Sequence, residues 1–196
     1  MPTTAADLQR VALELFATDG YASTSLQQIA DRAGVSKATV LYHFSSKEVL
    51  LESVLAPAVD QLESILGETK LAQLKGGGEG RAAFLARFVD FLLEHRSAAV
   101  VFVNQATSLV DVPIVQRANA EIELVSGYLE ASAGSIEEKV RFGVALGGAA
   151  YLLAGAPMMM PEQDVAVLRA ALITVLSDLL GVAPLLSSTV LATTAD

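Results

Sequence analysis

A short helix, a glycine turn and a second short helix within residues 25–43 most constrain how this chain can fold. The first helix is expected to begin at Thr24 or Ser25, where the side chain of Gln28 can reach back to the capping residue. Gly34 is suited to end that helix, because glycine adopts a left-handed backbone at little cost. Ser36 can then cap a second helix that runs to about His43. This layout predicts a helix-turn-helix.

Helical periodicity extends along the rest of the chain. Before the motif, apolar residues recur at i, i+3, i+4, i+7 and i+8 from Leu8 to Phe16. After it, Ser45 and Glu48 are spaced as a capping box, at the start of a helix with Pro57 as an expected kink or restart. KGGGEG, residues 75–80, is interpreted as a linker. Five further segments with helical period follow it, between residues 84 and 179.

These elements predict an all-α fold of about nine helices. Residues 1–50 are expected to form an N-terminal three-helix domain that contains the helix-turn-helix, and residues 51–181 a larger helical domain. Residues 182–196, rich in Ser, Thr and Ala, are expected to be a flexible tail. A chain of 196 residues with 53% hydrophobic residues can bury a core of this kind.

Charge is distributed unevenly along the chain. Of the formal net charge of −9, residues 1–50 carry −1 and residues 51–196 carry −8. Within the first part, residues 32–47, RAGVSKATVLYHFSSK, contain Arg32, Lys37 and Lys47 and no carboxylate. A polyanion meets less repulsion here than elsewhere on the chain, which favours this stretch as a nucleic-acid-binding surface.

Residues 16–51 resemble the N-terminal DNA-binding domain of the TetR family of bacterial transcriptional regulators. The likeness lies in three ordered pieces, IADRAGVSKAT, YHF and SKE, and it extends over about residues 5–55. It implies that the chain binds double-stranded operator DNA as a homodimer and places the second helix of the motif in the major groove. Two such helices related by a dyad read two half-sites, so the operator is expected to be a pseudo-palindrome. By the habit of the family, regulation is expected to be repression.

The resemblance also assigns roles to individual residues. Thr24 and Ser25 match phosphate contacts at the start of the first motif helix, and Lys47 matches a lysine that meets a phosphate at the start of the next helix. The predicted DNA-contacting residues are Thr24, Ser25, Gln27, Ser36, Lys37, Ala38, Thr39, Tyr42, His43 and Lys47. Core packing is the alternative for Tyr42, and simple solvation is the alternative for the two lysines. Leu41 departs from the family, which most often has a Tyr there that contacts the DNA backbone.

For the larger domain, the resemblance implies a ligand-binding bundle that dimerises through its two C-terminal long helices. The resemblance also implies that a small-molecule effector binds between helices, holds the recognition helices at the wrong separation and so lowers operator affinity. We expect a small, largely hydrophobic effector. Its predicted contacts, each with core packing as the alternative, are Phe88, Phe91, Phe102, Asn104, Gln105, Tyr128, Phe142 and Tyr151. The small residues expected to allow close approach across the dimer are Gly143, Gly147, Gly148 and Ala149.

Other classes of protein agree less well with the residues. Residues 142–161, FGVALGGAAYLLAGAPMMMP, are uncharged and contain a GxxxG spacing, so a helical membrane-associated or structural protein is the alternative function. Two prolines interrupt that run, and no basic cluster flanks it. The sequence has no nucleophile with a base partner, no phosphate-binding glycine loop and no set of metal ligands, so we predict no enzyme and no cofactor. The lack of Cys and of a secretory signal predicts a cytoplasmic protein.

Overall fold

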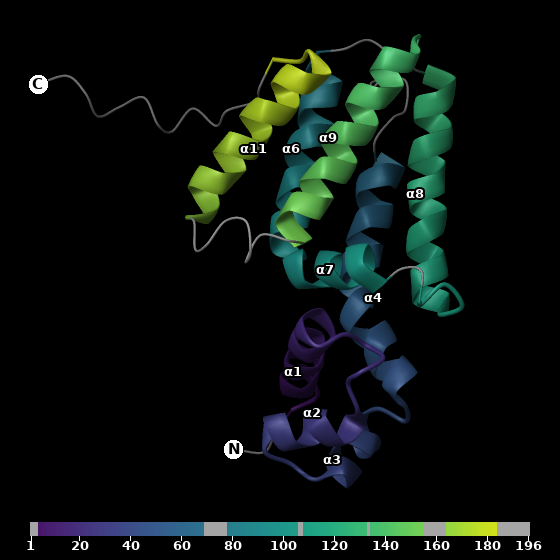
Figure 1. The fold of residues 1–196 in the computed structure, drawn as a ribbon, viewed down its shortest axis with the longest axis vertical. Helices are drawn as coiled ribbons and strands as arrows, with labels where there is room; N and C mark the ends of the chain where they lie inside the picture. The colour runs from purple at the N-terminus through teal and green to yellow at the C-terminus, as the bar shows by residue number, and fades with distance from the viewer. Residues whose placement is uncertain (1–3, 69–77, 106–107, 133, 155–163, 184–196) are drawn as a thin grey trace, which may run out of the picture.

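The computed structural model describes residues 4–68, 78–105, 108–132, 134–154 and 164–183, and their regular structure is entirely helical. Within these residues there are nine helices: α1 (Ala5–Thr18), α2 (Leu26–Ala33), α3 (Lys37–His43), α4 (Lys47–Glu68), α6 (Glu79–Glu94), α7 (Arg96–Gln105), α8 (Pro113–Ser132), α9 (Ile136–Ala154) and α11 (Val165–Leu180). The predicted all-α class is confirmed. Helices α1 to α3 and the start of α4 form a lower domain, and the other helices form an upper bundle (Figure 1).

The helix-turn-helix forms as the sequence predicts. Ser25 Oγ accepts from the backbone N–H of Gln28 at 3.2 Å, and Gln28 Oε1 accepts from the N–H of Ser25 at 2.7 Å. Gly34 ends α2 with a φ of 71°, in the left-handed region. Ser36 caps α3 by accepting from the N–H of Thr39 at 3.1 Å. Local hydrogen-bonding chemistry therefore sets both sides of the turn.

The core of the lower domain takes side chains from every helix of the motif. Phe16 of α1, Ile29 of α2 and Val40 of α3 are fully buried, and Phe44, directly after α3, is 7% exposed. Leu50 of α4 is also fully buried in this cluster. Truncation of a buried Phe to Ala costs about 3–5 kcal/mol in a packed core. Packing of these few side chains therefore fixes the angle between α2 and α3.

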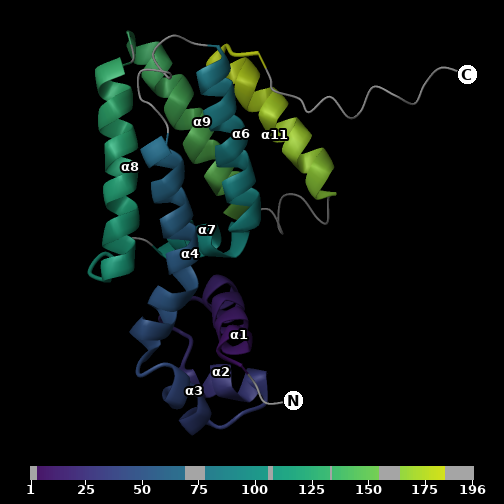
Figure 2. The same ribbon diagram turned by 180° about the vertical axis from the view of Figure 1, so that it is seen from behind.

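Helix α4 joins the two domains without a break. It runs from Lys47 to Glu68 with Pro57 inside it, and it rises from the lower domain into the upper bundle in both views (Figure 1 and Figure 2). The predicted division after residue 50 thus falls within a helix. Its first turn is capped by Ser46, whose Oγ accepts from the N–H of Val49 at 3.2 Å. The capping position predicted at Ser45 is wrong by one residue.

In the upper bundle, α6 packs against α9 and α11, and α8 lies along α4, while α7 crosses beneath them (Figure 1). Arg169 of α11 donates to both carboxylate oxygens of Asp90 on α6, at 2.5 and 2.9 Å. Arg117 of α8 bonds Asp60 and Glu63 of α4, each at 2.8 Å. Such exposed pairs add little stability individually, so burial of apolar side chains between the helices supplies most of it.

Two boundaries differ from the sequence predictions. Glu79 and Gly80, which we assigned to a linker, are the first residues of α6, and residues 75–77 lie outside the described residues. Val182, which we assigned to the tail, is 7% exposed and donates its N–H to the carbonyl of Ser177 at 2.9 Å. Gly181 has a φ of 64° after α11, so the chain turns back and packs Val182 into the core. Residues 184–196 lie outside the described residues.

Tyr21, in the loop between α1 and α2, bonds α4 and α7 through its polar groups and contacts α1 through its ring. Its carbonyl accepts from Lys47 Nζ of α4 at 2.9 Å, and its hydroxyl donates to Glu48 Oε1 at 3.2 Å. Lys47 Nζ also lies 4.2 Å from the centre of the Tyr21 ring, whose edge-to-face partner is Phe16 of α1. The N–H of Tyr21 donates to Gln105 Oε1 of α7 at 2.5 Å. The loop therefore links the lower domain to the base of the upper bundle.

Gln105 completes the backbone hydrogen bonds at the end of α1. Its Nε2 donates to the carbonyl of Phe16 at 2.8 Å, and the last carbonyls of a helix have no partner within the helix itself. Its Oε1 accepts from the N–H of Tyr21. One side chain of the upper bundle thus caps a helix of the lower domain.

We expect Tyr21 to titrate later than an ordinary tyrosine. Burial of the ring, the charge of Glu48 and the hydrogen bond to it raise the pKa of Tyr21 from 10.0 to about 12. The folded state therefore holds this proton more tightly than the unfolded state, so its contribution to stability is full below pH 10 and is lost as the pH rises to about 12. Absorbance titration of phenolate should show a late component that Tyr21→Phe removes, and identical late components in both proteins would contradict the prediction.

Replacement of Gln105 by Leu should lower the free energy of unfolding by about 1–3 kcal/mol, because the N–H of Tyr21 and the carbonyl of Phe16 lose their partner. Urea denaturation measures this loss. The matched control is Asn104→Leu, since Asn104 is the exposed neighbour on α7, and its effect should stay below about 0.5 kcal/mol. Equal losses in the two variants would show that the Gln105 hydrogen bonds do not stabilise the junction.

Candidate nucleic-acid interface and ligand cavity

The outer face of α3 presents polar and aromatic side chains to solvent. Lys37, Ala38 and His43 are exposed, Leu41 is 43% exposed and Tyr42 is 84% exposed. The ring of Tyr42 packs against that of His43, with centroids 5.2 Å apart, so core packing of Tyr42 is excluded. Helix α3 lies at the end of the molecule away from the upper bundle (Figure 1). This face can therefore approach a large partner without a clash with the bundle.

The other hydroxyl and amide side chains predicted to contact DNA make local hydrogen bonds. Ser36 Oγ lies 2.9 Å from Thr39 Oγ1, and Gln27 Nε2 donates to Asp31 Oδ1 at 2.7 Å. Ser25 takes part in the capping box of α2. All of them remain exposed or half-buried, and each keeps further donor or acceptor capacity. Their positions are compatible with contacts that replace or extend these local bonds.

Thr24 does not have the position expected of a phosphate contact. Its side chain is 2% exposed, and Oγ1 donates to the carbonyl of Gly20 at 2.8 Å. Its own carbonyl accepts from Lys47 Nζ at 2.9 Å. The physical reason is that the hydroxyl completes the loop before α2, which places it inside the domain. The structure corrects its role to one of holding the loop and Lys47.

Lys47 is bound to the same loop. Nζ donates to the carbonyls of Tyr21 and Thr24, both at 2.9 Å. An ammonium group has three donors, so one remains for another acceptor. The charge lies in the first turn of α4, where the helix dipole also favours an anion. Lys47 therefore supports the loop while keeping the capacity for the predicted phosphate contact.

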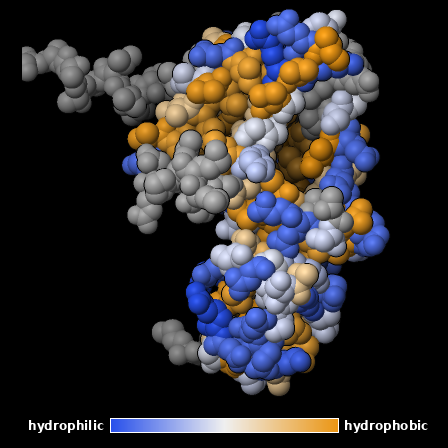
Figure 3. Space-filling model, in the orientation of Figure 1, coloured by the Kyte–Doolittle hydropathy of each residue, from blue (hydrophilic) through white to orange (hydrophobic). Residues whose placement is uncertain are grey.

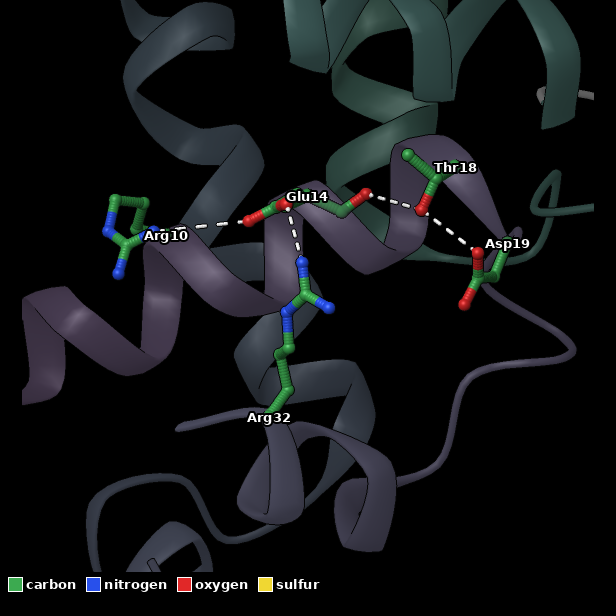
Figure 4. A network of polar contacts seen from close by, with 5 residues as sticks. All are labelled: Arg10, Glu14, Thr18, Asp19 and Arg32. Atoms are coloured by element: carbon green, nitrogen blue, oxygen red, sulfur yellow. Dashed lines mark hydrogen bonds and ion pairs between the residues drawn. The ribbon is translucent and has the colours of Figure 1, made fainter. Parts of the chain in front are cut away.

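Arg32 is paired with a carboxylate on α1. Its Nη2 lies 3.3 Å from Glu14 Oε1, and the other oxygen of Glu14 lies 3.9 Å from Arg10 Nη1 (Figure 4). Further along α1, Thr18 Oγ1 donates to the Glu14 carbonyl at 3.1 Å and to Asp19 Oδ1 at 3.0 Å. The positive charge offered to a polyanion on this domain therefore comes mainly from α3 and from the start of α4.

A cavity of about 350 Å³ lies in the upper bundle, with walls from α4, α6, α7, α8 and α9. Its opening is seen as an apolar hollow between α9 and α8 (Figure 3). Four of the residues predicted to contact an effector line it: Phe88, Phe91, Phe102 and Phe142. The lining is mostly aromatic and aliphatic, so the cavity suits an apolar molecule.

The other predicted effector contacts lie elsewhere or outside the described residues. Gln105 caps α1, Asn104 is exposed on α7, and Tyr151 is 65% exposed on α9. The side chain of Tyr128 lies outside the described residues. Residues close together on a helix face different directions, so residue type by itself does not tell which side chains point inward.

Three polar residues that we did not predict also line the cavity: His95, Glu121 and Ser126. His95 directly follows α6, and its Nε2 lies 2.5 Å from Gln61 Oε1 of α4. A sequence signal for His95 exists, because it follows Phe91 by four residues and so continues the apolar stripe of α6. No comparable signal in the sequence of α8 indicates that Glu121 lines a cavity.

The surface of α9 and α11 carries several exposed apolar side chains, and the space-filling view is largely hydrophobic over these helices (Figure 3). Val144 and Tyr151 of α9 are 56% and 65% exposed, and Val167 and Val175 of α11 are 61% and 63% exposed. An apolar surface shared by two neighbouring helices is typical of a protein–protein contact.

The small residues of α9 do not all lie on that surface. Gly143 and Gly147 line the cavity, and Ala149 is buried at 3%, whereas Gly148 is exposed. The GxxxG spacing therefore makes room for the cavity, and the predicted role of Ala149 in a dimer contact is wrong. In the described part of the chain, no helix is long and apolar enough to cross a membrane. The same residues contain no cluster of three or more potential metal ligands.

Comparison with known proteins identifies a family for the helix-turn-helix domain. Residues 8–54 match the family model described as bacterial regulatory proteins, tetR family. The repressor KstR2 of Mycolicibacterium smegmatis is 34% identical over 114 residues, which are 55% of this chain and 52% of that protein. The activator FasR of the same organism is 42% identical over 86 residues, 44% of this chain and 38% of that protein. The chain thus matches about half or less of the length of these curated relatives.

A solved structure extends the likeness to the whole fold. The crystal structure of the probable transcriptional regulatory protein RHA5900 superposes with a TM-score of 0.68, at 23% identity, over 94% of this chain and 100% of that one. The likeness in fold therefore extends from the helix-turn-helix to the upper bundle. Residues 8–54 thus belong to the TetR family of bacterial regulatory proteins, and the chain shares the fold of RHA5900 over most of its length.

Proposed function

We propose that the chain is a cytoplasmic transcriptional repressor that binds a pseudo-palindromic operator as a homodimer and is released by a small, largely hydrophobic effector. The observation that carries the proposal is the free outer face of α3, where Lys37 and Tyr42 project from a segment that has no carboxylate. A helix of two turns fits a major groove, and its first residues face the base edges. Repression follows KstR2, the relative with the longer match. FasR is named as an activator, so the match to FasR is the argument for activation instead of repression.

The homodimer is supported by the exposed apolar surface of α9 and α11. Val144, Val167 and Val175 together leave more apolar area in water than isolated surface residues do. A second copy of the same surface would bury them, and a two-fold axis makes such a contact self-complementary. The dimer also has a functional reason, because one short recognition helix reads too few bases for a specific site.

A route from the cavity to the DNA-binding domain runs through α7. Phe102 and Val103 line the cavity, and Gln105 on the same helix caps α1 and bonds the loop of Tyr21. That loop in turn holds Lys47 at the start of α4. A ligand that favours another position of α7 would therefore shift the lower domain. Regulation requires such a ligand to make different contacts in the two positions of α7.

Lys37→Ala should weaken binding to DNA from upstream of the chain's own gene by roughly tenfold and alter its base preference, because a lysine at the start of a recognition helix reaches base edges. The affinity is measured for that DNA and for random DNA of equal length, across a salt series. Arg10→Ala is the control, since Arg10 is an exposed cation on α1, and it should change little. Equal losses on specific and random DNA would contradict a base-reading role.

Lys47→Met should weaken binding to all DNA sequences. The slope of log affinity against log salt concentration should become less steep by about one, the effect of one lost phosphate contact. The substitution should also lower the stability of the domain, because the carbonyls of Tyr21 and Thr24 lose a charged donor. DNA binding is therefore compared at a temperature at which circular dichroism shows both proteins folded. An unchanged salt dependence would assign Lys47 a purely structural role.

The double variant Val144→Glu with Val175→Glu should convert the dimer to monomers, because burial of unpaired carboxylates across the interface is strongly unfavourable. Sedimentation equilibrium measures the mass. The control is Leu124→Glu, because Leu124 is 65% exposed on α8, away from the proposed interface. If the double variant and the Leu124→Glu control were both dimeric, the interface would lie elsewhere.

A further inference from the structure

One wall of the cavity is a row of aromatic rings on α6 and on His95, the residue that directly follows it. The centroids of Phe84 and Phe88 are 6.0 Å apart with nearly parallel rings, and those of Phe88 and Phe91 are 6.2 Å apart. The ring of His95 follows that of Phe91 at 5.4 Å. All four rings line the cavity. Eleven residues of helix rise about 16 Å, so the row forms an elongated aromatic surface.

The rest of the lining is mostly apolar. Phe102 of α7 and Phe142 of α9 add two further rings, and aliphatic residues such as Leu62 and Leu146 also line the cavity. The cavity of about 350 Å³ is near the lower end of the range of about 300–1,000 Å³ for ligand sites. Flat rings pack against such a wall by stacked and edge-to-face contacts.

The charges around the cavity disfavour an anion. No Lys or Arg is among the described lining residues, and the titratable groups among them are His95 and Glu121. Arg81 lies over the ring of Phe142, but its guanidinium is paired with Glu138 at 2.6 Å. A ligand carboxylate would lose its hydration on entering the cavity, and no cation among the described lining residues would compensate that loss. The carboxylate of Glu121 would also repel it.

The polar end of the aromatic row is set by a hydrogen-bond chain. Gln61 Nε2 donates to Glu94 Oε2 at 3.1 Å, so its Oε1 is the acceptor that faces His95 Nε2 at 2.5 Å. Nε2 of His95 therefore carries the proton, and Nδ1 of the neutral ring is an acceptor. Within the described residues, no hydrogen bond to Nδ1 is formed. Because His95 lines the cavity, a ligand there that donates a hydroxyl proton finds a matching acceptor on this ring.

We propose that the effector is an uncharged molecule with flat rings and a hydroxyl group, whose rings lie along the aromatic row of α6 and whose hydroxyl donates to His95. This rests on the proposed function, because it names the chemical class of the effector at the same site. It excludes fatty acids and other carboxylates as the preferred ligands. It also makes His95 the residue that distinguishes a hydroxylated ligand from a plain hydrocarbon.

Four probes test the proposal on the purified full chain without DNA: 4-phenylphenol, biphenyl, biphenyl-4-carboxylate and dodecanoate. Isothermal titration calorimetry at pH 7.5 measures the dissociation constants. We expect 4-phenylphenol to bind roughly tenfold more tightly than biphenyl, the effect of one hydrogen bond. Both carboxylates should bind more weakly still. Preference for either carboxylate, or no binding of any probe, would overturn the proposal.

Variants of the site separate the hydrogen bond from the shape of the cavity. His95→Phe should bring 4-phenylphenol to within about twofold of biphenyl and keep biphenyl binding, because it retains a ring but loses the nitrogen. Gln61→Leu should reduce the preference for 4-phenylphenol over biphenyl without filling the cavity. Without the Gln61 acceptor, the proton of His95 is no longer held on Nε2. Gly147→Leu should abolish binding of all four probes, since Gly147 lines the cavity and has open space beside it.

The variant results have their own contrary outcomes. An unchanged preference for 4-phenylphenol in folded His95→Phe would refute the role of His95. Thermal unfolding of each unliganded variant shows whether it is folded, and Gln61→Leu serves as the second test if His95→Phe is not. Operator binding is measured separately. Specific DNA binding together with a preference for carboxylates would refute this inference alone, whereas a preference for the phenol without DNA binding would refute the proposed function alone.

Discussion

The backbone of Tyr21 ties the loop between α1 and α2 to two other helices, and one of these bonds reaches the upper bundle. Its N–H is bonded by Gln105 from the upper bundle, and its carbonyl is bonded by Lys47 from the start of α4. A loop between two helices needs partners for its peptide groups when it is partly buried, and here those partners come from other domains or helices. The positions of α1, α4 and α7 therefore depend on one another.

The same arrangement limits what the DNA-binding surface can be. Thr24 and Arg32 are polar and near the recognition helix, but the first is buried beneath Lys47 and the second is paired with Glu14. The free face is consequently small and centres on α3, with few cations. A net charge of −9 repels DNA at long range, so the proposed binding to DNA relies mainly on short-range contacts of this face.

The cavity results from an unusual combination of small and aromatic residues. Gly143 and Gly147 of α9 have no side chains to fill the space that Phe88 and Phe91 of α6 border. Open space in a protein interior forfeits dispersion contacts, so a ligand that fills it stabilises the bundle. The GxxxG spacing of Gly143 and Gly147 is typical of contacts between membrane helices. In this folded chain it lies beside a cavity, where the missing side chains leave space.

The amino-acid sequence by itself determined the helices and the turn of the motif, because caps at Ser25 and Ser36 and the left-handed Gly34 act over a few residues. Four of the eight predicted effector contacts, all of them phenylalanines, line the cavity, because large apolar side chains are those most often turned inward. Only the tertiary structure decided that Gln105 bonds a loop 84 residues away, that Thr24 is buried and that Tyr151 faces outward. Such contacts depend on how whole helices pack, and packing is a property of distant side chains together, which no local pattern encodes.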